Sequence, residues 1–588
     1  MKYFAKIGRR AAPGRTPARR GTVDGTTPAC RPCADGGEPG CTSRPVRRHA
    51  TRVLAFVLAL LPAGSAAHAQ DIPAEVDRIF SWATANSPGC VVGIARHGEV
   101  LVNRAYGMAD LERGVALTPQ TVFDIGSTHK QFIAAAVLLL VQDGRLALTD
   151  DIRKYIPELP DYGHTVTIDH LLTHTSGIRD WVWLSQVTEA REDALTLILR
   201  QRGLNFAPGE EWSYSNSGFV LLKEIVARVS GQSFGEFVQA RVFEPLGMKS
   251  TRYAADATAV PNHALAYQQE GEQWKVDMLL GNARGGGGVF TTTGDLLTWN
   301  DALTNERLGA FLSTKIQEAA RLANGRTLDY ARGLMIDDDG EIVWHSGSAA
   351  AYKSILARLP RKGASLAMLC NAGDVVDRRN YEVAILDLLA PEPATSRAAA
   401  EGASGTKAAV DVAIPDLEKR AGLFFSERTG EPLRLVVNEG SLRLAGGPAL
   451  VGVAEDRFRN PRGLMRFMSK DEFELHFVSE DRLELKSMEG QVTRYHRAQP
   501  YAPGAADLAG FAGRYETDEI GTIVVTPTAS GLSARLNSSP TAEFAPVHPD
   551  VFQRGAMTIR FRRDAAGTVT GLELSNPVLR NARFPRKS

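Results

Sequence analysis

The stretch FDIGSTHKQFIAAAVLLL, residues 123–140, places a serine and a lysine directly before an almost unbroken apolar run. The run predicts a helix that is buried on all sides. Ser127 and Lys130 are three residues apart and share one face of such a helix, so the hydroxyl and the amine can form a hydrogen bond. A lysine shielded from water has a lowered pKa and can take the serine proton, which turns the hydroxyl into a nucleophile.

Two motifs further along the chain supply matching chemistry. Tyr214 and Asn216, in PGEEWSYSNSGFVLL, place a phenol and an amide just before an apolar helical segment. His345 and Gly347, in IVWHSGSAAAYKS, lie in a strand-like segment where a small residue allows close backbone approach to a ligand. Each motif alone fits a structural interpretation, a helix-capping loop or an edge strand with a glycine. Together with the serine and lysine they form a set that chance rarely produces.

Composition excludes some classes of function. The chain has 588 residues, of which 44% are hydrophobic and 23% charged, and this is ordinary for a soluble globular protein of several domains. The formal net charge of +1 gives no electrostatic reason to expect nucleic acid or an acidic membrane surface as a partner.

The N-terminal region predicts export. Residues 1–46 are rich in Arg, Gly, Pro and Thr and are predicted to be disordered or an incorrectly assigned upstream segment. Residues 47–69 contain a basic stretch, then an apolar run, and then Ala67-His68-Ala69, two small residues separated by one other. This is the order of a signal peptide, with cleavage after Ala69. We favour the general secretory route because no apolar residue follows the arginine pair closely. The apolar run is too short for a permanent membrane anchor, so the mature protein is expected in the periplasm or secreted.

Two cysteines, Cys90 and Cys370, follow the predicted cleavage site, and both lie in predicted strands. An oxidising compartment leaves a disulfide between them open. Two buried thiols are the simpler interpretation and the one we favour.

Periodicity divides the mature chain. Residues 70–390 mix helical and strand patterns, with strands at both ends that are expected to meet in one antiparallel sheet around a helical layer. Residues 391–414 are rich in Ala, Pro and Ser and predict a linker. Short alternating runs then predict two small antiparallel β domains, barrel-like, over 415–500 and 501–588. The two share a sequence beginning, Asp-Leu followed by Ala-Gly.

Residues 72–389 resemble the penicillin-recognising serine hydrolases: class C β-lactamases, serine D,D-carboxypeptidases, D-aminopeptidases and related esterases. The resemblance includes the three motifs and the segments VTIDHLLTHTSGI, FAPGEEWSYSNSG, VFEPLGM and GGGGVFTTTGDLLTW. It implies an α/β (α+β) fold in which an antiparallel sheet packs against a helical domain, with the active site between them.

The resemblance also implies roles for individual residues. Ser127 would be the acylated nucleophile and Lys130 its general base, while Tyr214 would carry the proton to the leaving group and later activate water. Asn216 would bind the substrate amide. The backbone N–H groups of Ser127 and Ser348, the latter beside Gly347, would form the oxyanion hole.

His345 stands where many relatives have lysine. Histidine has a reference pKa of about 6.5 and is largely neutral at pH 7 unless a partner holds its proton. A neutral histidine supplies no permanent charge for a substrate carboxylate, although D-aminopeptidases and some D,D-carboxypeptidases of the family also have histidine here.

A catalytic domain followed by two small β domains resembles the bacterial D-aminopeptidases. The leading hypothesis is an exported serine hydrolase acting on amide bonds of D-amino-acid peptides or amides. The alternatives are a D,D-carboxypeptidase or β-lactamase-like amidase, or an esterase; a non-catalytic wall-binding protein would have lost one of the three catalytic residues. A generic wall-binding role for the tail stays open.

No cofactor and no metal is expected. His170 and His174 have helical spacing but lack the glutamate of a His-Glu-x-x-His zinc site. The expected partner is a small-molecule or peptide substrate, with a peptidoglycan-derived one left open, and the oligomeric state is not predicted.

Overall fold

The structure is a computed structural model. It describes residues 71–188, 192–256, 259–278, 287–337, 340–373, 381, 384–386, 389, 413–427, 432–445, 449–460, 473–487, 492–499, 501–555, 557–576 and 578–587. The predicted upstream segment and signal peptide, and the predicted linker up to residue 412, lie outside the described residues. Helix α13 begins at Ile414, so the last residue assigned to the linker is helical.

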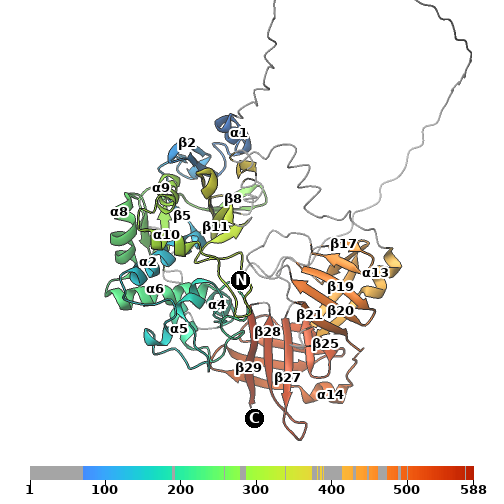
Figure 1. The fold of residues 1–588 in the computed structure, drawn as a ribbon. Helices are drawn as coiled ribbons and strands as arrows, with labels where there is room; N and C mark the ends of the chain where they lie inside the picture. Colours follow the sequence, from blue (N-terminus) through green and yellow to red (C-terminus); the bar gives the residue numbers. More distant parts are fainter. Residues whose placement is uncertain are drawn as a thin grey trace, which may run out of the picture. The chain divides into compact units, whose positions relative to one another are not determined.

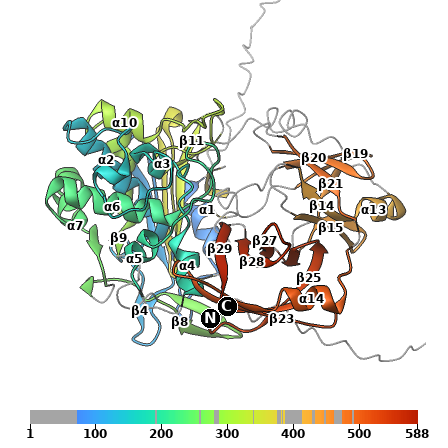
Figure 2. The same cartoon turned by 90° about the horizontal axis from the view of Figure 1, so that it is seen from below.

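The first and last strands of the N-terminal half meet in one antiparallel sheet, which confirms the expected topology (Figures 1 and 2). Strands β1 (Cys90–Arg96) and β2 (Glu99–Tyr106) form a hairpin whose turn residues His97 and Gly98 both have positive φ, as a type I′ two-residue turn requires. In order across the sheet the strands are β10 (Met335–Asp337), β11 (Ile342–Ala349), β12 (Tyr352–Leu359), β13 (Ala364–Cys370), β1 (Cys90–Arg96) and β2 (Glu99–Tyr106).

The central strands are covered on both faces. Side chains of a strand alternate between faces, and in β1 Val91 and Ala95 join the larger hydrophobic core. Val92 and Ile94 belong to a second core on the opposite face, where helix α1 (Ile72–Ile79) packs. This double burial explains why β1 is almost continuously apolar rather than alternating with polar residues.

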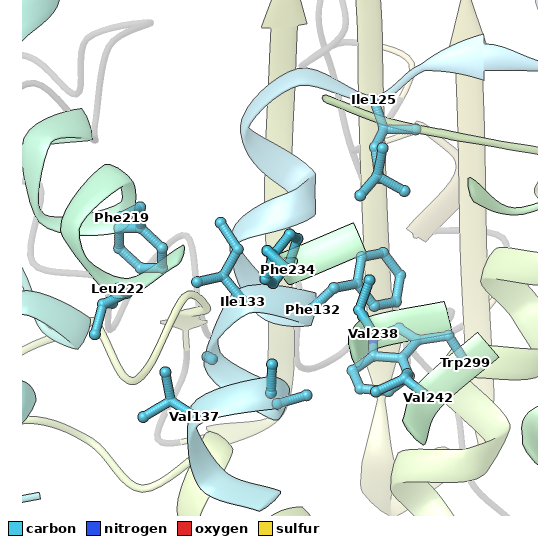
Figure 3. Packing of buried hydrophobic residues seen from close by; sticks show 14 of the residues in the cluster. Ile125, Phe132, Ile133, Val137, Phe219, Leu222, Phe234, Val238, Val242 and Trp299 are labelled. Carbon is cyan, nitrogen blue, oxygen red and sulfur yellow. The ribbon is translucent and has the colours of Figure 1, made fainter. Parts of the chain in front are cut away.

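Helix α2 (Lys130–Gln142) is the centre of the larger core. Every residue from Lys130 to Leu140 is buried, as the apolar run predicts. Figure 3 shows Phe132 beside Trp299 of α9 (Thr293–Thr304), and Ile133 and Val137 on the side of α6 (Asn216–Ser230). The helix is therefore held from several sides, which fixes the position of its N-terminal end.

Further helices and short strands surround this core. The helices are α3 (Ile168–Leu172), α4 (Trp181–Val187), α5 (Ala194–Leu199), α7 (Phe234–Val238), α8 (Glu244–Leu246) and α10 (Ala310–Ile316). The strands are β3 (Met108–Asp110), β4 (Val115–Ala116), β5 (Phe123–Asp124), β6 (Arg252–Ala254), β7 (Tyr267–Glu270), β8 (Gln273–Val276) and β9 (Gly288–Thr291). Within the described ranges, no helix combines the length and apolar character needed to cross a membrane.

The C-terminal part is antiparallel β structure, as predicted. It contains an eight-stranded sheet and a closed eight-stranded barrel. A short helix precedes each, α13 (Ile414–Arg420) and α14 (Ala505–Gly510), in line with the shared sequence beginning. The sheet strands are β14 (Gly422–Ser426), β15 (Pro432–Asn438), β16 (Ser441–Leu444), β17 (Val451–Ala454), β18 (Arg457–Arg459), β19 (Phe473–Ser479), β20 (Arg482–Ser487) and β21 (Val492–Arg497). The barrel strands are β22 (Gly513–Thr517), β23 (Gly521–Pro527), β24 (Leu532–Leu536), β25 (Ala542–His548), β26 (Val551–Arg554), β27 (Met557–Arg563), β28 (Val569–Asn576) and β29 (Leu579–Lys587).

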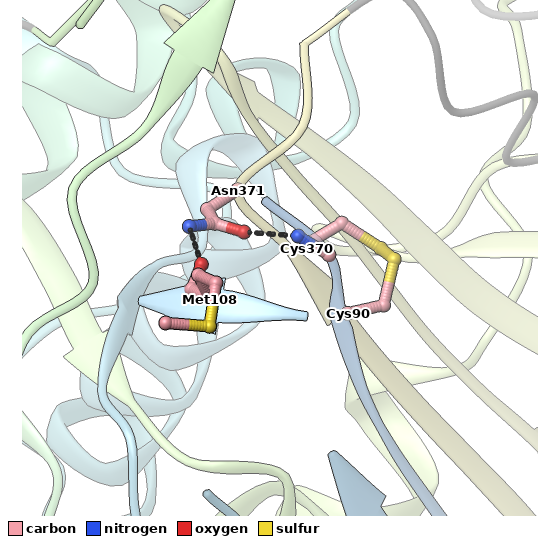
Figure 4. Close-up of a disulfide and its surroundings, with 5 residues drawn as sticks. Cys90, Met108, Cys370 and Asn371 are labelled. Carbon is pink, nitrogen blue, oxygen red and sulfur yellow. Dashed lines mark hydrogen bonds between the residues drawn. A yellow bond between two sulfur atoms is a disulfide. The ribbon is translucent and has the colours of Figure 1, made fainter. Parts of the chain in front are cut away.

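Cys90 and Cys370 form a disulfide, so the interpretation as two thiols is wrong (Figure 4). The two residues face each other in the β1–β13 register, with Cα atoms 4.0 Å apart. Asn371 continues the connection, because its side chain accepts a hydrogen bond from Gly89 N–H and donates one to the Met108 carbonyl. Strand register across 280 residues of sequence cannot be deduced from the cysteines alone.

We expect the protein purified after export, starting beyond Ala69, to show no thiol when denatured without reductant and two after reduction. Replacing both cysteines with alanine should lower the unfolding free energy of this part of the chain by about 2–5 kcal/mol. Thiol titration and calorimetry measure the two effects. Two titratable thiols in the unreduced, denatured protein would contradict the disulfide.

Candidate active site

Ser127 and Lys130 meet at the start of helix α2. Residues Gly126–His129 form a single 3-10 turn, designated η1, and α2 follows directly. The Lys130 Nζ donates a hydrogen bond of 3.0 Å to the Ser127 Oγ. The Lys130 side chain is only 2% exposed, whereas Ser127 is partly exposed. The hydroxyl can thus meet a substrate while its partner amine stays away from water.

Burial changes the ionisation of Lys130. It lowers the pKa of the amine to about 7, with a further decrease from the charge of Lys223 and an opposing increase from Asp180. The amine also lies 4.8 Å from the centre of the Tyr214 ring and donates a 2.9 Å hydrogen bond to Asn216 Oδ1. A substantial fraction of Lys130 is therefore uncharged at neutral pH and able to accept a proton.

Tyr214 reaches the same hydroxyl. Its side chain hydrogen-bonds to Ser127, and burial raises the pKa of the phenol. Tyr214 is therefore protonated in the resting site and is suited to give a proton rather than to remove the first one. Of the two partners of Ser127, Lys130 is the one that can act as the initial base.

Asp180 orients the amide of Asn216, and sequence reasoning missed it. Its Oδ2 accepts hydrogen bonds from the Asn216 N–H at 2.5 Å and the Asn216 Nδ2 at 3.1 Å. Because the Asn216 Nδ2 donates to Asp180, its Oδ1 faces Lys130. Asp180 also caps helix α4 through Val182 N–H. An aspartate before a helix was the only signal in the sequence, and a cap explains it without any link to Lys130.

The neighbouring Arg179 contacts the barrel. It forms a buried ion pair of 2.7 Å with Glu519, which also accepts a hydrogen bond from Arg202 N–H. Arg179 O accepts a hydrogen bond from Ser217, in the first turn of α6. The barrel therefore contributes to holding the segment that carries Asp180.

Two glycines allow strand β11 to lie against the turn that carries Ser127. A Cβ on Gly347 would lie 1.8 Å from the Ile125 carbonyl oxygen, and one on Gly126 would lie 2.6 Å from the Ser348 nitrogen. Gly347 thus permits contact with the protein's own backbone, not only with a ligand. The approach brings the Ser348 amide next to Gly126, one residue from Ser127.

His345 lies at the edge of this group. Its side chain is 4% exposed, and its ring centre is 6.3 Å from that of Tyr214. Burial, assisted by the charge of Lys130, lowers its pKa to about 3. The imidazole is therefore neutral and does not replace the permanent charge of a lysine. Of the seven residues predicted for the site, six lie on elements that meet here: Ser127 on η1, Lys130 on α2, Asn216 on α6, and His345, Gly347 and Ser348 on β11. The seventh, Tyr214, lies in the loop just before α6, with its ring beside Lys130 and His345.

The two histidines considered as a zinc pair have other partners. His170 Nδ1 accepts from Thr167 N–H in the capping box of α3, and His174 hydrogen-bonds to Tyr330 and Ser215. Across the residues that the structure describes, no three His, Cys, Asp or Glu side chains are grouped to hold a metal ion.

The chain is similar to known proteins of one family. A family model described as Beta-lactamase matches residues 76–390, more than half of the 588 residues. The chain belongs to this family. Penicillin-binding protein 4* of Bacillus subtilis (strain 168) is 30% identical to this chain over 321 residues, which cover 50% of this chain and 69% of that protein.

Two other relatives extend the comparison. Protein flp of Staphylococcus aureus (strain N315) is 27% identical over 296 residues, covering 48% of this chain and 59% of that protein. The D-amino acid amidase of Ochrobactrum anthropi SV3, solved with L-phenylalanine, is 24% identical with a TM-score of 0.44, covering 54% of this chain and 96% of that one.

The pKa of Lys130 predicts the pH dependence of hydrolysis. Because the base must be uncharged, kcat/KM should fall about tenfold per pH unit below about 7 and level off above it. A short-chain p-nitrophenyl ester without a titrating group, followed at an isosbestic wavelength, measures this profile. An acidic limb near pH 10, or no limb between pH 5 and 9, would contradict the assignment.

Asp180→Asn should move that acidic limb to lower pH, because the charge of Asp180 raises the pKa of Lys130. The changed hydrogen bonding of Asn216 should also lower the plateau rate by about ten- to a hundredfold. Asp193→Asn is the matched control, since Asp193 likewise caps a helix but contacts Thr196 rather than Asn216. An unshifted limb in Asp180→Asn would exclude the electrostatic role.

Proposed function

We propose that the protein is a serine hydrolase that forms an acyl-enzyme on Ser127. The contact that carries the proposal is the 3.0 Å hydrogen bond between Ser127 Oγ and the buried Lys130 amine. Lys130 takes the hydroxyl proton while Oγ bonds to the substrate carbonyl carbon. The backbone N–H groups of Ser127 and Ser348 stabilise the oxyanion. The tetrahedral intermediate then collapses: the bond to the leaving nitrogen breaks, Tyr214 delivers its proton to that nitrogen, and Lys130 passes the proton it took from Ser127 on to Tyr214.

Water completes the cycle. It attacks the acyl carbonyl, its proton goes to the Tyr214 and Lys130 pair, and Ser127 Oγ leaves with a proton. Asn216 binds the amide of the substrate. Its Nδ2 carries two protons, and the one that is not donated to Asp180 serves this contact.

The proposed substrates are amides or peptides of D-amino acids, as for a D-aminopeptidase. Support comes from the neutral His345, which offers no fixed charge to a C-terminal carboxylate. The order of the chain gives further support, since the catalytic part precedes two antiparallel β structures as in the D-aminopeptidases it resembles. A peptidoglycan-derived peptide would fit this class.

The similarity to penicillin-binding protein 4* favours a second candidate, a D,D-carboxypeptidase or β-lactamase-like amidase. An esterase would use the same Ser127 chemistry and differ in its leaving group. The proposal includes export through residues 47–69, with which the Cys90–Cys370 disulfide agrees because disulfides persist in oxidising compartments.

A substrate panel with Ser127→Ala tests the function. We expect the native protein to hydrolyse D-alanine p-nitroanilide faster than the L-isomer, a D-Ala-D-Ala peptide or nitrocefin. We expect Ser127→Ala to lose at least about a thousandfold in rate with an unchanged melting temperature. Intact mass after a fluorophosphonate should increase only when Ser127 is present.

Full hydrolysis by Ser127→Ala would refute the mechanism. Turnover of only the ester, only nitrocefin or only the D-Ala-D-Ala peptide would keep the nucleophile and move the function to the corresponding alternative.

A further inference from the structure

Three buried rings form a hydrogen-bonded chain behind the candidate site. His174 Nε2 lies 3.0 Å from the Tyr330 hydroxyl, and the same hydroxyl lies 3.4 Å from His345 Nε2. All three side chains are at most 4% exposed. Neither His174 nor Tyr330 touches Ser127 in the hydrogen bonds above, and the proposed reaction steps do not use them.

The direction of each hydrogen bond in this chain is fixed by one backbone amide. Ser215 N–H can only donate, and it lies 3.0 Å from His174 Nδ1, so that nitrogen accepts and the His174 proton sits on Nε2. His174 Nε2 therefore donates to the Tyr330 hydroxyl. The single hydroxyl proton of Tyr330 is then given to His345 Nε2.

The other nitrogen of His345 agrees with this assignment. Its Nδ1 lies 2.6 Å from the carbonyl oxygen of Ser346, which can only accept, so Nδ1 carries the proton. The lone pair of His345 Nε2 is occupied by Tyr330. A second proton on His345 would oppose the Tyr330 hydroxyl proton and would sit in a buried site near the charge of Lys130.

His174 also holds Tyr214 in place. Its carbonyl accepts from Ser213 N–H and its ring accepts from Ser215 N–H, so it binds the amides on both sides of Tyr214. The centres of the His174 and Tyr214 rings lie 4.3 Å apart. His174 has a φ of 60°, a left-handed conformation that residues other than glycine adopt only with backbone strain. Such strain is common where a side chain must be held for function.

We propose that His174 and Tyr330 are positioning residues that hold Tyr214 against Ser127 and keep His345 as a neutral acceptor. The wall of the site beside the oxyanion donors then carries no charge, and the site selects acyl donors with an amide or ester in place of a terminal carboxylate. This selection rests on the proposed function, whereas the proton positions do not.

The proton positions can be measured without a substrate. In protein labelled with ¹⁵N in the histidine rings, long-range ¹H–¹⁵N spectra at pH 7 should place the proton of His345 on Nδ1 and that of His174 on Nε2. Either histidine in the opposite tautomer, or a protonated His345, would overturn the proposal even if the enzyme had another substrate.

Tyr330→Phe removes only the hydroxyl. Without the Tyr330 hydroxyl, His345 Nε2 is free to take a proton below pH 6, and the resulting charge attracts a carboxylate. The discrimination between a D-peptide amide and the same peptide with a free carboxylate should therefore fall about fivefold or more below pH 6, through a lower KM for the carboxylate. A merely structural role would change both substrates equally and would contradict the proposal. The titratable groups that face His345 are Lys130, Tyr214, Tyr330, His174 and His129. Tyr330→Phe leaves the other four unchanged.

Tyr515→Phe is the matched control. It also removes a buried tyrosine hydroxyl, which donates to the Phe511 carbonyl at 2.8 Å, and should leave the discrimination unchanged. His174→Asn keeps an acceptor for Ser215 but loses the donor to Tyr330. We expect it to lower kcat more than it changes KM, because Tyr214 loses the ring that packs against it. An unchanged kcat in His174→Asn would exclude the positioning of Tyr214.

Discussion

The chemistry of this protein depends on keeping one amine dry while a hydroxyl beside it meets the substrate. Lys130 is 2% exposed because it begins a helix whose next ten residues are also buried. In contact with water the amine would be protonated at neutral pH and could not accept the serine proton. The apolar run after Lys130 therefore serves the reaction as well as the core.

Much of the surrounding fold follows from that requirement. A dry amine still needs polar partners, and it has Ser127 and Asn216, the latter oriented by Asp180. Strand β11 lies against the turn that carries Ser127, and it can do so only because Gly126 and Gly347 lack a Cβ. The central sheet fixes that strand. The Arg179–Glu519 ion pair connects the segment that carries Asp180 to the barrel. The C-terminal part therefore supports the site indirectly, by holding that segment.

The sequence predicts the elements that carry local patterns. Alternation revealed the β1–β2 hairpin and the C-terminal strands, and the three-residue spacing of Ser127 and Lys130 placed both on one face. Local patterns in the sequence could not reveal contacts that depend on strand register or on packing. The Cys90–Cys370 pairing needs the register of strands far apart in sequence, and Asp180 and Tyr330 meet the site only after folding. His174 looked like part of a connecting segment, because nothing local shows that its ring lies against Tyr214.

The most direct test is the ionisation of Lys130 itself. In protein labelled with ¹⁵N at lysine Nζ, with the signal assigned through Lys130→Met, the chemical shift is followed from pH 5 to pH 11. We expect a midpoint near 7, far below the ordinary value of 10.5. A midpoint near 10.5 would mean that the amine is charged at neutral pH, and Lys130 could not be the base that activates Ser127.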